Sequence, residues 1–179
     1  MKQALLSFIC TFAILYNGNA QNTSVIPPKV LGEVKMDNGI IYRVHDFIWG
    51  DDFGMFKQAG DENWKGVVLY VSLENSTEKE VPHDFIILST VLYSTVGRYG
   101  VADGRATVIK SVMKSKGRIP KDIESQNAIN ANSIKVLKPH QKIGCWGTAF
   151  AMKKTDSGPF YLDFKSGLSG KTYTMKLKL

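Results

Sequence analysis

Residues 66–75, with the sequence GVVLYVSLEN, decide the fold class of this chain. Every second position in the segment carries an aliphatic side chain, namely Val67, Leu69, Val71 and Leu73. Because successive side chains of a β-strand point to opposite faces, this period of two predicts a half-buried strand. The polar sequence that follows, Asn75-Ser76-Thr77, predicts a turn at its end.

The segments before this strand predict a β-hairpin. Residues 30–36 alternate between apolar and polar side chains, and residues 40–49 (IIYRVHDFIW) continue in an extended pattern. Between them, Asp37-Asn38-Gly39 supplies the residue types that adopt the positive φ values of a tight turn.

The segments after it predict further strands. Residues 83–93 (HDFIILSTVLY) are apolar on both faces and rich in β-branched residues, which favours a central strand. Residues 141–152 form another strand with both faces available for packing, and residues 160–165 and 172–179 form a closing hairpin. Together these patterns predict an all-β fold, an antiparallel immunoglobulin-like β-sandwich of about seven or more strands.

The order of these segments resembles a known group of proteins. The segments KVLGEVKMDNGIIYRV, GVVLYVSLENSTEKEV, HDFIIL and LKPHQKIGCWGTAFAM follow one another as in small bacterial exported domains of unknown function, in the immunoprotective, immunoglobulin-like extracellular superfamily. The resemblance covers most of residues 30–179, although His140-Gln141 replaces the usual Gly-Glu after Pro139. The positions that match the pattern are Gly32, Asn75, Asp84, Phe85, Leu88, Pro139 and Phe150. The resemblance implies a β-sandwich with a binding or scaffolding role, and it carries over no catalytic residue.

The N-terminus predicts export. Residues 4–16 form an apolar run after Met1-Lys2, and the polar segment that follows ends in small residues at Ala20. This pattern is typical of a secretory signal peptide over residues 1–20. As a helix the run would cover only about 20 Å, too short for a membrane span. We therefore expect a periplasmic or extracellular protein with no transmembrane segment in the mature chain.

Cleavage after Ala20 would leave an extended lead-in at 21–29 and one sandwich domain at 30–179. Pro27-Pro28 excludes a helix in the lead-in. Cys145 would be the single cysteine of the mature chain, so no intrachain disulfide is expected. We interpret it as a buried structural thiol, because no histidine or arginine beside it would lower the pKa of the thiol.

Composition and charge exclude several classes of protein. The chain has 179 residues, of which 44% are hydrophobic and 22% charged, as expected of one folded globular domain rather than a disordered or fibrous chain. The formal charge of +7 is unevenly distributed, with a net charge of −4 over residues 21–100 and +10 over residues 101–179. Export and the excess of nineteen Lys over four Arg argue against a nucleic-acid partner.

Two segments interrupt the strand pattern. Residues 50–64 form a loop rich in Gly and Asp, and residues 101–138 form a long insertion with a possible short helix near 105–115. Long connecting segments often carry function in compact domains, so we expect binding to map to one of these two.

The first of these loops contains the candidate binding residues. Four aromatic residues lie in it or flank it: Trp49, Phe53, Phe56 and Trp64. They could stack on sugars or anchor a protein partner, or they could fold under to close the end of the sandwich.

The same loop contains acidic residues that could bind a metal. Asp51, Asp52, Asp61 and Glu62 are oxygen ligands of the kind that Ca²⁺ prefers, although their spacing is not that of an EF-hand and a solvated acidic turn is the favoured interpretation. A zinc site would need His45-Asp46 and His83-Asp84 to meet in space.

Three functions follow from these residues. The first is a non-catalytic exported protein, without a cofactor, that binds a protein or cell-envelope component through its loops. The second is a glycan- or ligand-binding module that uses the loop aromatics. The third, with the weakest support, is a metal-dependent hydrolase built on His45, His83 and their acidic neighbours.

Overall fold

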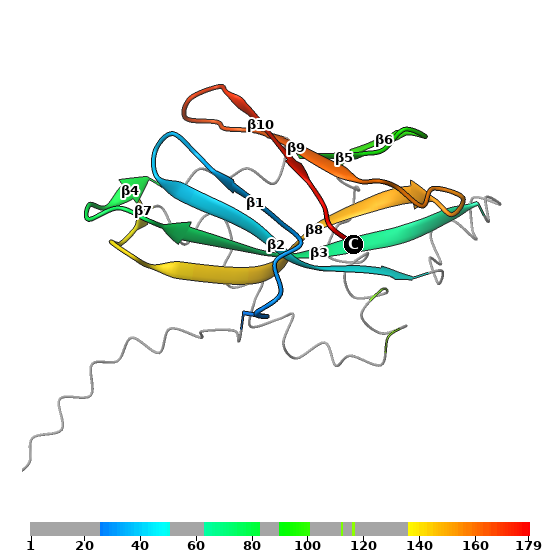
Figure 1. Ribbon diagram of the computed structural model, residues 1–179, viewed down its shortest axis with the longest axis horizontal. Helices are drawn as coiled ribbons and strands as arrows, with labels where there is room; N and C mark the ends of the chain where they lie inside the picture. Colours follow the sequence, from blue (N-terminus) through cyan, green and yellow to red (C-terminus); the bar gives the residue numbers. More distant parts are fainter. Residues whose placement is uncertain (1–25, 51–62, 83–89, 101–111, 113–115, 117–135) are drawn as a thin grey trace, which may run out of the picture.

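The structure of the chain is a computed structural model, which describes residues 26–50, 63–82, 90–100, 112, 116 and 136–179. For residues 145–148 it describes the backbone alone. The described part of the chain is all β, with ten strands arranged in two four-stranded sheets and a short two-stranded ribbon (Figure 1).

The first sheet contains the long strands. Its order is β1 (Gly32–Lys35), β2 (Ile40–Gly50), β3 (Trp64–Asn75) and β8 (Lys142–Lys153), and all pairings are antiparallel. The predicted hairpin joins β1 to β2 with Gly39 at a φ of 86°. Asn38 Oδ1 accepts a hydrogen bond from the Ile40 amide at 3.1 Å, which fixes the turn.

The second sheet packs over the first, and its strands are shorter. Its order is β10 (Thr172–Lys176), β9 (Tyr161–Lys165), β5 (Val91–Tyr93) and β6 (Arg98–Gly100), again antiparallel throughout. The predicted final hairpin, β9–β10, is confirmed.

A two-stranded ribbon of β4 (Val81–Pro82) and β7 (Val136–Leu137) lies at one end of the sandwich. Asn75 ties this ribbon to the end of β3. Its fully buried side chain donates to the carbonyls of Lys79, Leu137 and Lys138 and accepts from the Thr77 amide at 3.0 Å. A buried amide with this many partners specifies one geometry for the turn.

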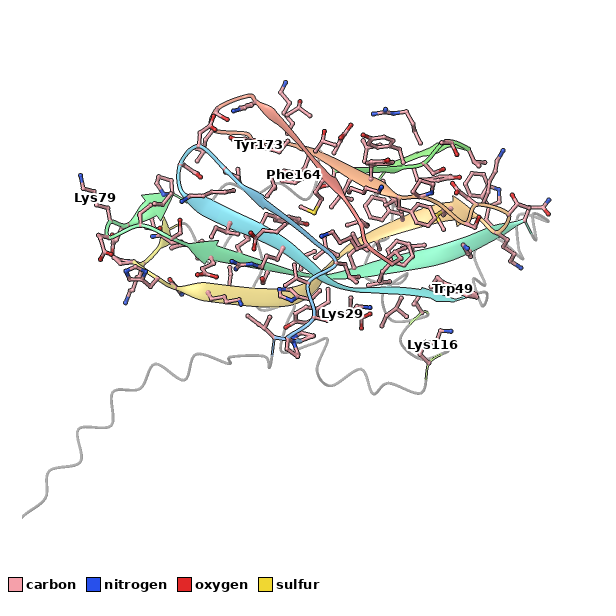
Figure 2. All side chains as sticks on the ribbon, in the orientation of Figure 1. Lys29, Trp49, Lys79, Lys116, Phe164 and Tyr173 are labelled. Carbon is pink, nitrogen blue, oxygen red and sulfur yellow. The ribbon has the colours of Figure 1, made fainter. Side chains whose placement is uncertain are left out.

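The core lies between the two sheets. Tyr42 of β2 packs on Phe164 of β9 with ring centroids 4.8 Å apart, and Phe164 stacks on Tyr173 of β10 at 5.6 Å (Figure 2). Phe150 of β8 and Leu92 of β5 are fully buried in the same cluster. The alternation read from the sequence therefore directs these side chains inward from both sheets.

The edges of the two sheets meet along one side. The Lys178 amide, just after β10, donates to the Leu31 carbonyl, just before β1, at 2.7 Å. At Gly32, an added Cβ would meet the Lys176 carbonyl oxygen at 3.1 Å. This seam allows no side chain at position 32 without a shift of its neighbours.

The predicted fold class is confirmed: the chain is an antiparallel, all-β sandwich with more than seven strands. Its assignment as immunoglobulin-like stays a prediction. One expectation for an element is wrong. Strand β3 is buried on both faces rather than one, with Val68 and Tyr70 exposed by 2% or less.

The lead-in segment contributes to the burial of the outer face of β3. An added Cβ at Gly144, on the neighbouring strand β8, would meet both Ile26 Cγ1 and the Tyr70 hydroxyl at 2.9 Å. Of the helix predicted near 105–115, the structure describes Val112 alone, which is buried. The rest of that segment lies outside the described residues.

Candidate functional site

The structure describes two of the four aromatic residues predicted to bind, Trp49 and Trp64, and Trp49 is the exposed one. It stands near the end of β2, opposite Val67 of β3, and its side chain is 44% exposed. The ammonium nitrogens of Lys65 and Lys116 each lie 4.9 Å from the centroid of its ring. Figure 2 labels Trp49 and Lys116. An indole that holds two cations is a preferred cation–π partner, and we call Trp49, Lys65 and Lys116 the tryptophan site.

Lys65 links this site to the interior. The residue is 9% exposed and lies opposite Met152 of β8. Its ammonium donates to the Asp156 carbonyl oxygen at 3.3 Å while it contacts the Trp49 ring. A buried ammonium needs such partners to offset the loss of water. The position of Trp49 is therefore coupled to the loop that follows β8.

Asp156 organises that loop. Its carboxylate accepts hydrogen bonds from Ser94 Oγ at 2.5 Å, from the Tyr99 hydroxyl at 2.7 Å and from the Gly158 amide at 3.0 Å. Burial by itself would raise the pKa of Asp156, but these hydrogen bonds and the charge of Lys65 outweigh it and lower that pKa. The carboxylate is thus held ionised, as a structural group rather than a proton donor.

The pKa of Tyr99 shifts in the opposite direction. Burial, the hydrogen bond to Asp156 and the charge of that carboxylate raise the pKa of Tyr99 to about 12. Its phenol therefore stays protonated at neutral pH and keeps donating to the carboxylate.

Trp64, the second described tryptophan of the predicted set, packs inward. It lies against the hydrophobic core and meets the ring of Tyr99 edge to face, with centroids 6.3 Å apart. The structure therefore brings Trp49 and Trp64 to the same end of β2 and β3 but leaves only Trp49 substantially exposed.

The other predicted site residues lie outside the described part of the chain. These are the aromatic residues Phe53 and Phe56 and the calcium candidates Asp51, Asp52, Asp61 and Glu62. Within the residues that the structure does describe, no group of three or more His, Cys, Asp or Glu side chains is placed to hold a metal ion.

Of the two histidines in the hydrolase hypothesis, the structure describes His45. His45 is buried at the bulge of β2, where Nδ1 lies 2.8 Å from the Lys29 carbonyl and Nε2 lies 2.7 Å from Ser72 Oγ. Burial lowers the pKa of His45, and the charges of Lys142 and Arg43 lower it further. His140 lies 3.0 Å from Glu78, and His83 is outside the described residues.

The sequence reasoning missed Lys65, Lys116 and Asp156. Lys65 precedes the alternating run of β3 at the correct spacing to share the face of Val67, which is the one signal that could have found it. It also missed the half-buried pair of Tyr93 and Tyr161 on the outer face of the second sheet. The spacing of Tyr161 and Asp163 marks them as outward positions of β9.

Comparisons with known proteins find distant structural similarities. No protein-family model and no curated protein matches the chain. A conserved hypothetical protein from Bacillus anthracis is 16% identical, with 84% of this chain and 94% of that chain covered and a TM-score of 0.49. A protein of unknown function from Listeria monocytogenes is 7% identical, with 84% and 83% covered and a TM-score of 0.46.

A candidate lipoprotein from Bacillus subtilis is also similar in structure. It is 10% identical to this chain, with a TM-score of 0.47 over 82% of this chain and 38% of its own length. The chain thus spans well under half of that protein. In the described segments, no helix has the length and apolar character needed to cross a bilayer.

Proposed function

We propose that this chain is an exported, non-catalytic binding protein that recognises a protein or cell-envelope component through the tryptophan site and the loop after β2. The exposure of Trp49 carries the proposal. Trp is enriched among the residues that dominate binding energy, and a large ring left 44% exposed on a rigid sheet is a pre-ordered contact.

The charges around Trp49 support an acidic partner. Lys65 and Lys116 each place an ammonium 4.9 Å from the ring centroid, so two positive charges accompany the apolar contact. A partner that offers a carboxylate or another anion beside an apolar group would complement both features.

The same contacts disfavour a glycan at this ring. Sugar stacking needs an open aromatic face, whereas two ammonium groups occupy positions over Trp49 and Trp64 packs against the core. A neutral sugar would have to displace a cation from the indole.

The absence of catalysis is part of the proposal. It is supported by two buried titratable groups of the described residues, Asp156 and His45, whose hydrogen-bonding atoms are engaged in holding the fold. Neither has an atom free to transfer a proton to a substrate in this conformation.

The binding role is tested with the purified protein immobilised and a detergent extract of the producing bacterium's envelope as analyte. We expect Trp49→Ala to reduce the bound material by about tenfold or more, as for a central interface residue. Leu168→Ala is the matched control, because Leu168 is 59% exposed on the turn between β9 and β10. Equal binding by wild type and Trp49→Ala would contradict the proposal.

Export is tested separately by fractionating cells and sequencing the N-terminus of the mature chain. We expect the protein outside the cytoplasm with Gln21 as its first residue. An intact N-terminus in the cytoplasmic fraction would be contrary to this part of the proposal.

A further inference from the structure

The two sheets of the sandwich differ in how their outer faces are covered. On the first sheet, Val68, Tyr70 and Ser72 point away from the core and are nevertheless exposed by 2% or less. On the second sheet, the outward residues of β10 are exposed, as is Arg98 of β6, and Tyr93 of β5 and Tyr161 of β9 are half-buried between them. The second sheet therefore presents an open face.

Aromatic and cationic side chains form a row across this open face. Tyr93 of β5 lies opposite both Tyr161 of β9 and Arg98 of β6 in the strand register. The two tyrosine rings stack with centroids 5.3 Å apart and an angle of 18°, and the Arg98 guanidinium lies 5.0 Å from the Tyr93 centroid. This row is ordered by its own contacts, so little side-chain entropy remains to be lost on binding.

Asp163 fixes the row from one side. Its carboxylate accepts a hydrogen bond from Thr174 Oγ1 at 2.6 Å and lies 3.5 Å from Arg98 Nη2. Burial raises the pKa of Tyr93, and the nearby charge of Asp163 and a hydrogen bond to it add to the shift. We call Tyr93, Arg98, Tyr161, Asp163 and Thr174 the tyrosine patch.

The charge of this face is positive. Lys165 and Lys176 are exposed on β9 and β10 beside the patch, and Arg98 keeps 66% of its side chain exposed despite its contact with Asp163. Among the described residues of this face, the cations thus outnumber the carboxylate of Asp163, which is already hydrogen-bonded. An approaching acidic group would be attracted, whereas a basic one would be repelled.

We propose that the tyrosine patch is a second docking surface, which binds an acidic segment of a partner protein. Tyr and Arg are the residue types enriched at the centres of protein interfaces, and here they are surrounded by lysines as a polar rim. A glycan is disfavoured, because the tyrosine rings cover one another's faces and Arg98 lies over the far side of Tyr93. This inference rests on the proposed binding role but not on the tryptophan site.

The test is a titration of the isotopically labelled purified protein with a poly-glutamate peptide, followed by amide NMR shifts. We expect the largest shifts in β5, β6, β9 and β10, and none of comparable size for a poly-glutamine peptide of equal length. Shifts spread evenly over all exposed lysines would overturn the proposal, since they would indicate unspecific attraction to a basic protein.

Variants separate the patch from the overall charge. The double variant Arg98→Gln, Lys176→Gln should bind the peptide about tenfold more weakly. The control double variant Lys138→Gln, Lys153→Gln removes the same charge from exposed positions in other parts of the fold and should bind nearly as wild type does. An equal loss in both would contradict the assignment.

The aromatic contribution has its own variant. Tyr161→Thr keeps a strand-forming residue and the net charge, so weaker peptide binding with an unchanged amide spectrum elsewhere would support the patch. Unchanged binding would refute it.

Tighter binding of a uronic-acid oligosaccharide than of the peptide would replace the proposed partner by a glycan. Self-association that is lost in the Arg98→Gln, Lys176→Gln variant would replace it by a second copy of this chain. The shifts in β5, β6, β9 and β10 should persist in Trp49→Ala, whereas any shifts around the tryptophan site should be lost in that variant, so failure of one proposal is distinguishable from failure of the other.

Discussion

At the scale of single residues, Asp156 joins parts of the chain that are distant in sequence. Its carboxylate receives hydrogen bonds from Ser94 and Tyr99, and its carbonyl receives one from Lys65. These contacts connect β3, the β5–β6 hairpin and the loop after β8. The exposed indole of Trp49 rests on this network through Lys65, so the network supports the proposed binding end.

We expect Asp156→Asn to lower the free energy of unfolding by about 3 kcal/mol. The substitution removes the buried negative charge and places the asparagine NH₂ group against groups that themselves donate hydrogen bonds. Tyr99→Phe is the matched control, which deletes one hydrogen bond and should cost about 1 kcal/mol. Urea unfolding measures both. A variant Asp156→Asn as stable as wild type would mean that the carboxylate is not held as described.

The lowered pKa of Asp156 also predicts how stability depends on pH. A carboxyl group with a lower pKa in the folded state stabilises the fold above its unfolded value and loses that contribution as pH falls. The wild type should therefore lose stability from about pH 4 downward more steeply than Asp156→Asn. Parallel acid-unfolding curves for the two proteins would disagree with this expectation.

His45 predicts a second pH dependence at higher pH. Its pKa is lowered by burial, so the unfolded chain takes up a proton more readily than the folded one. The stability held by neutral His45 should be full above about pH 6.5 and decrease as pH falls below it. In His45→Gln this decrease should disappear from thermal unfolding curves, and its persistence would assign the effect to another group.

Residue-level outcomes were only partly predictable from the sequence. The buried position of His45 follows from a bulge between Val44 and Asp46, which places two residues of β2 against one of β3. No local pattern announces such a bulge. The cation contacts of Trp49 were equally hidden, because Lys65 and Lys116 come from separate segments.

At the scale of elements, the strands with clean alternation were predictable. The β1–β2 and β9–β10 hairpins carry their own turn residues and need no distant information. The burial of the outer face of β3 was not predictable, because one residue known to cover it is Ile26, forty residues before the strand's centre and in a segment without strand pattern. Short strands such as β4 and β7 have two residues each and no readable period.

The seam between β1 and β10 gives a prediction at this scale. Gly32→Ala places a Cβ 3.0 Å from Met175 Sδ and 3.1 Å from the Lys176 carbonyl, so we expect a loss of about 1–2 kcal/mol in unfolding free energy. Gly100→Ala is the control, because an added Cβ there meets nothing within 4 Å, and it should be neutral or slightly stabilising. Equal effects of the two substitutions would show that the seam is looser than the structure indicates.

At the scale of the whole molecule, the residues that stabilise the sandwich are different from those that we propose bind a partner. The core fills the space between two sheets, and the middle of one outer face is covered. The exposed ring of Trp49 stands at the end of β2, and the half-buried rings of Tyr93 and Tyr161 stand on the outer face of the second sheet. The sandwich architecture was predictable from alternation, but the pairing of β3 with β8 was not, since it joins residues that are 68 to 89 positions apart in the sequence. The uneven charge of the two halves indicated an acidic partner only after the structure placed the lysines beside aromatic rings.

The central claim is that this sandwich binds its partner at the tryptophan site, and photo-crosslinking in the producing cells tests it most directly. A photoreactive amino acid replaces Trp49 in one strain and Leu168 in another, at positions that are similarly exposed. We expect a discrete adduct of defined mass from position 49 and none from position 168. The absence of an adduct at position 49, or the same adducts from both positions, would contradict the account.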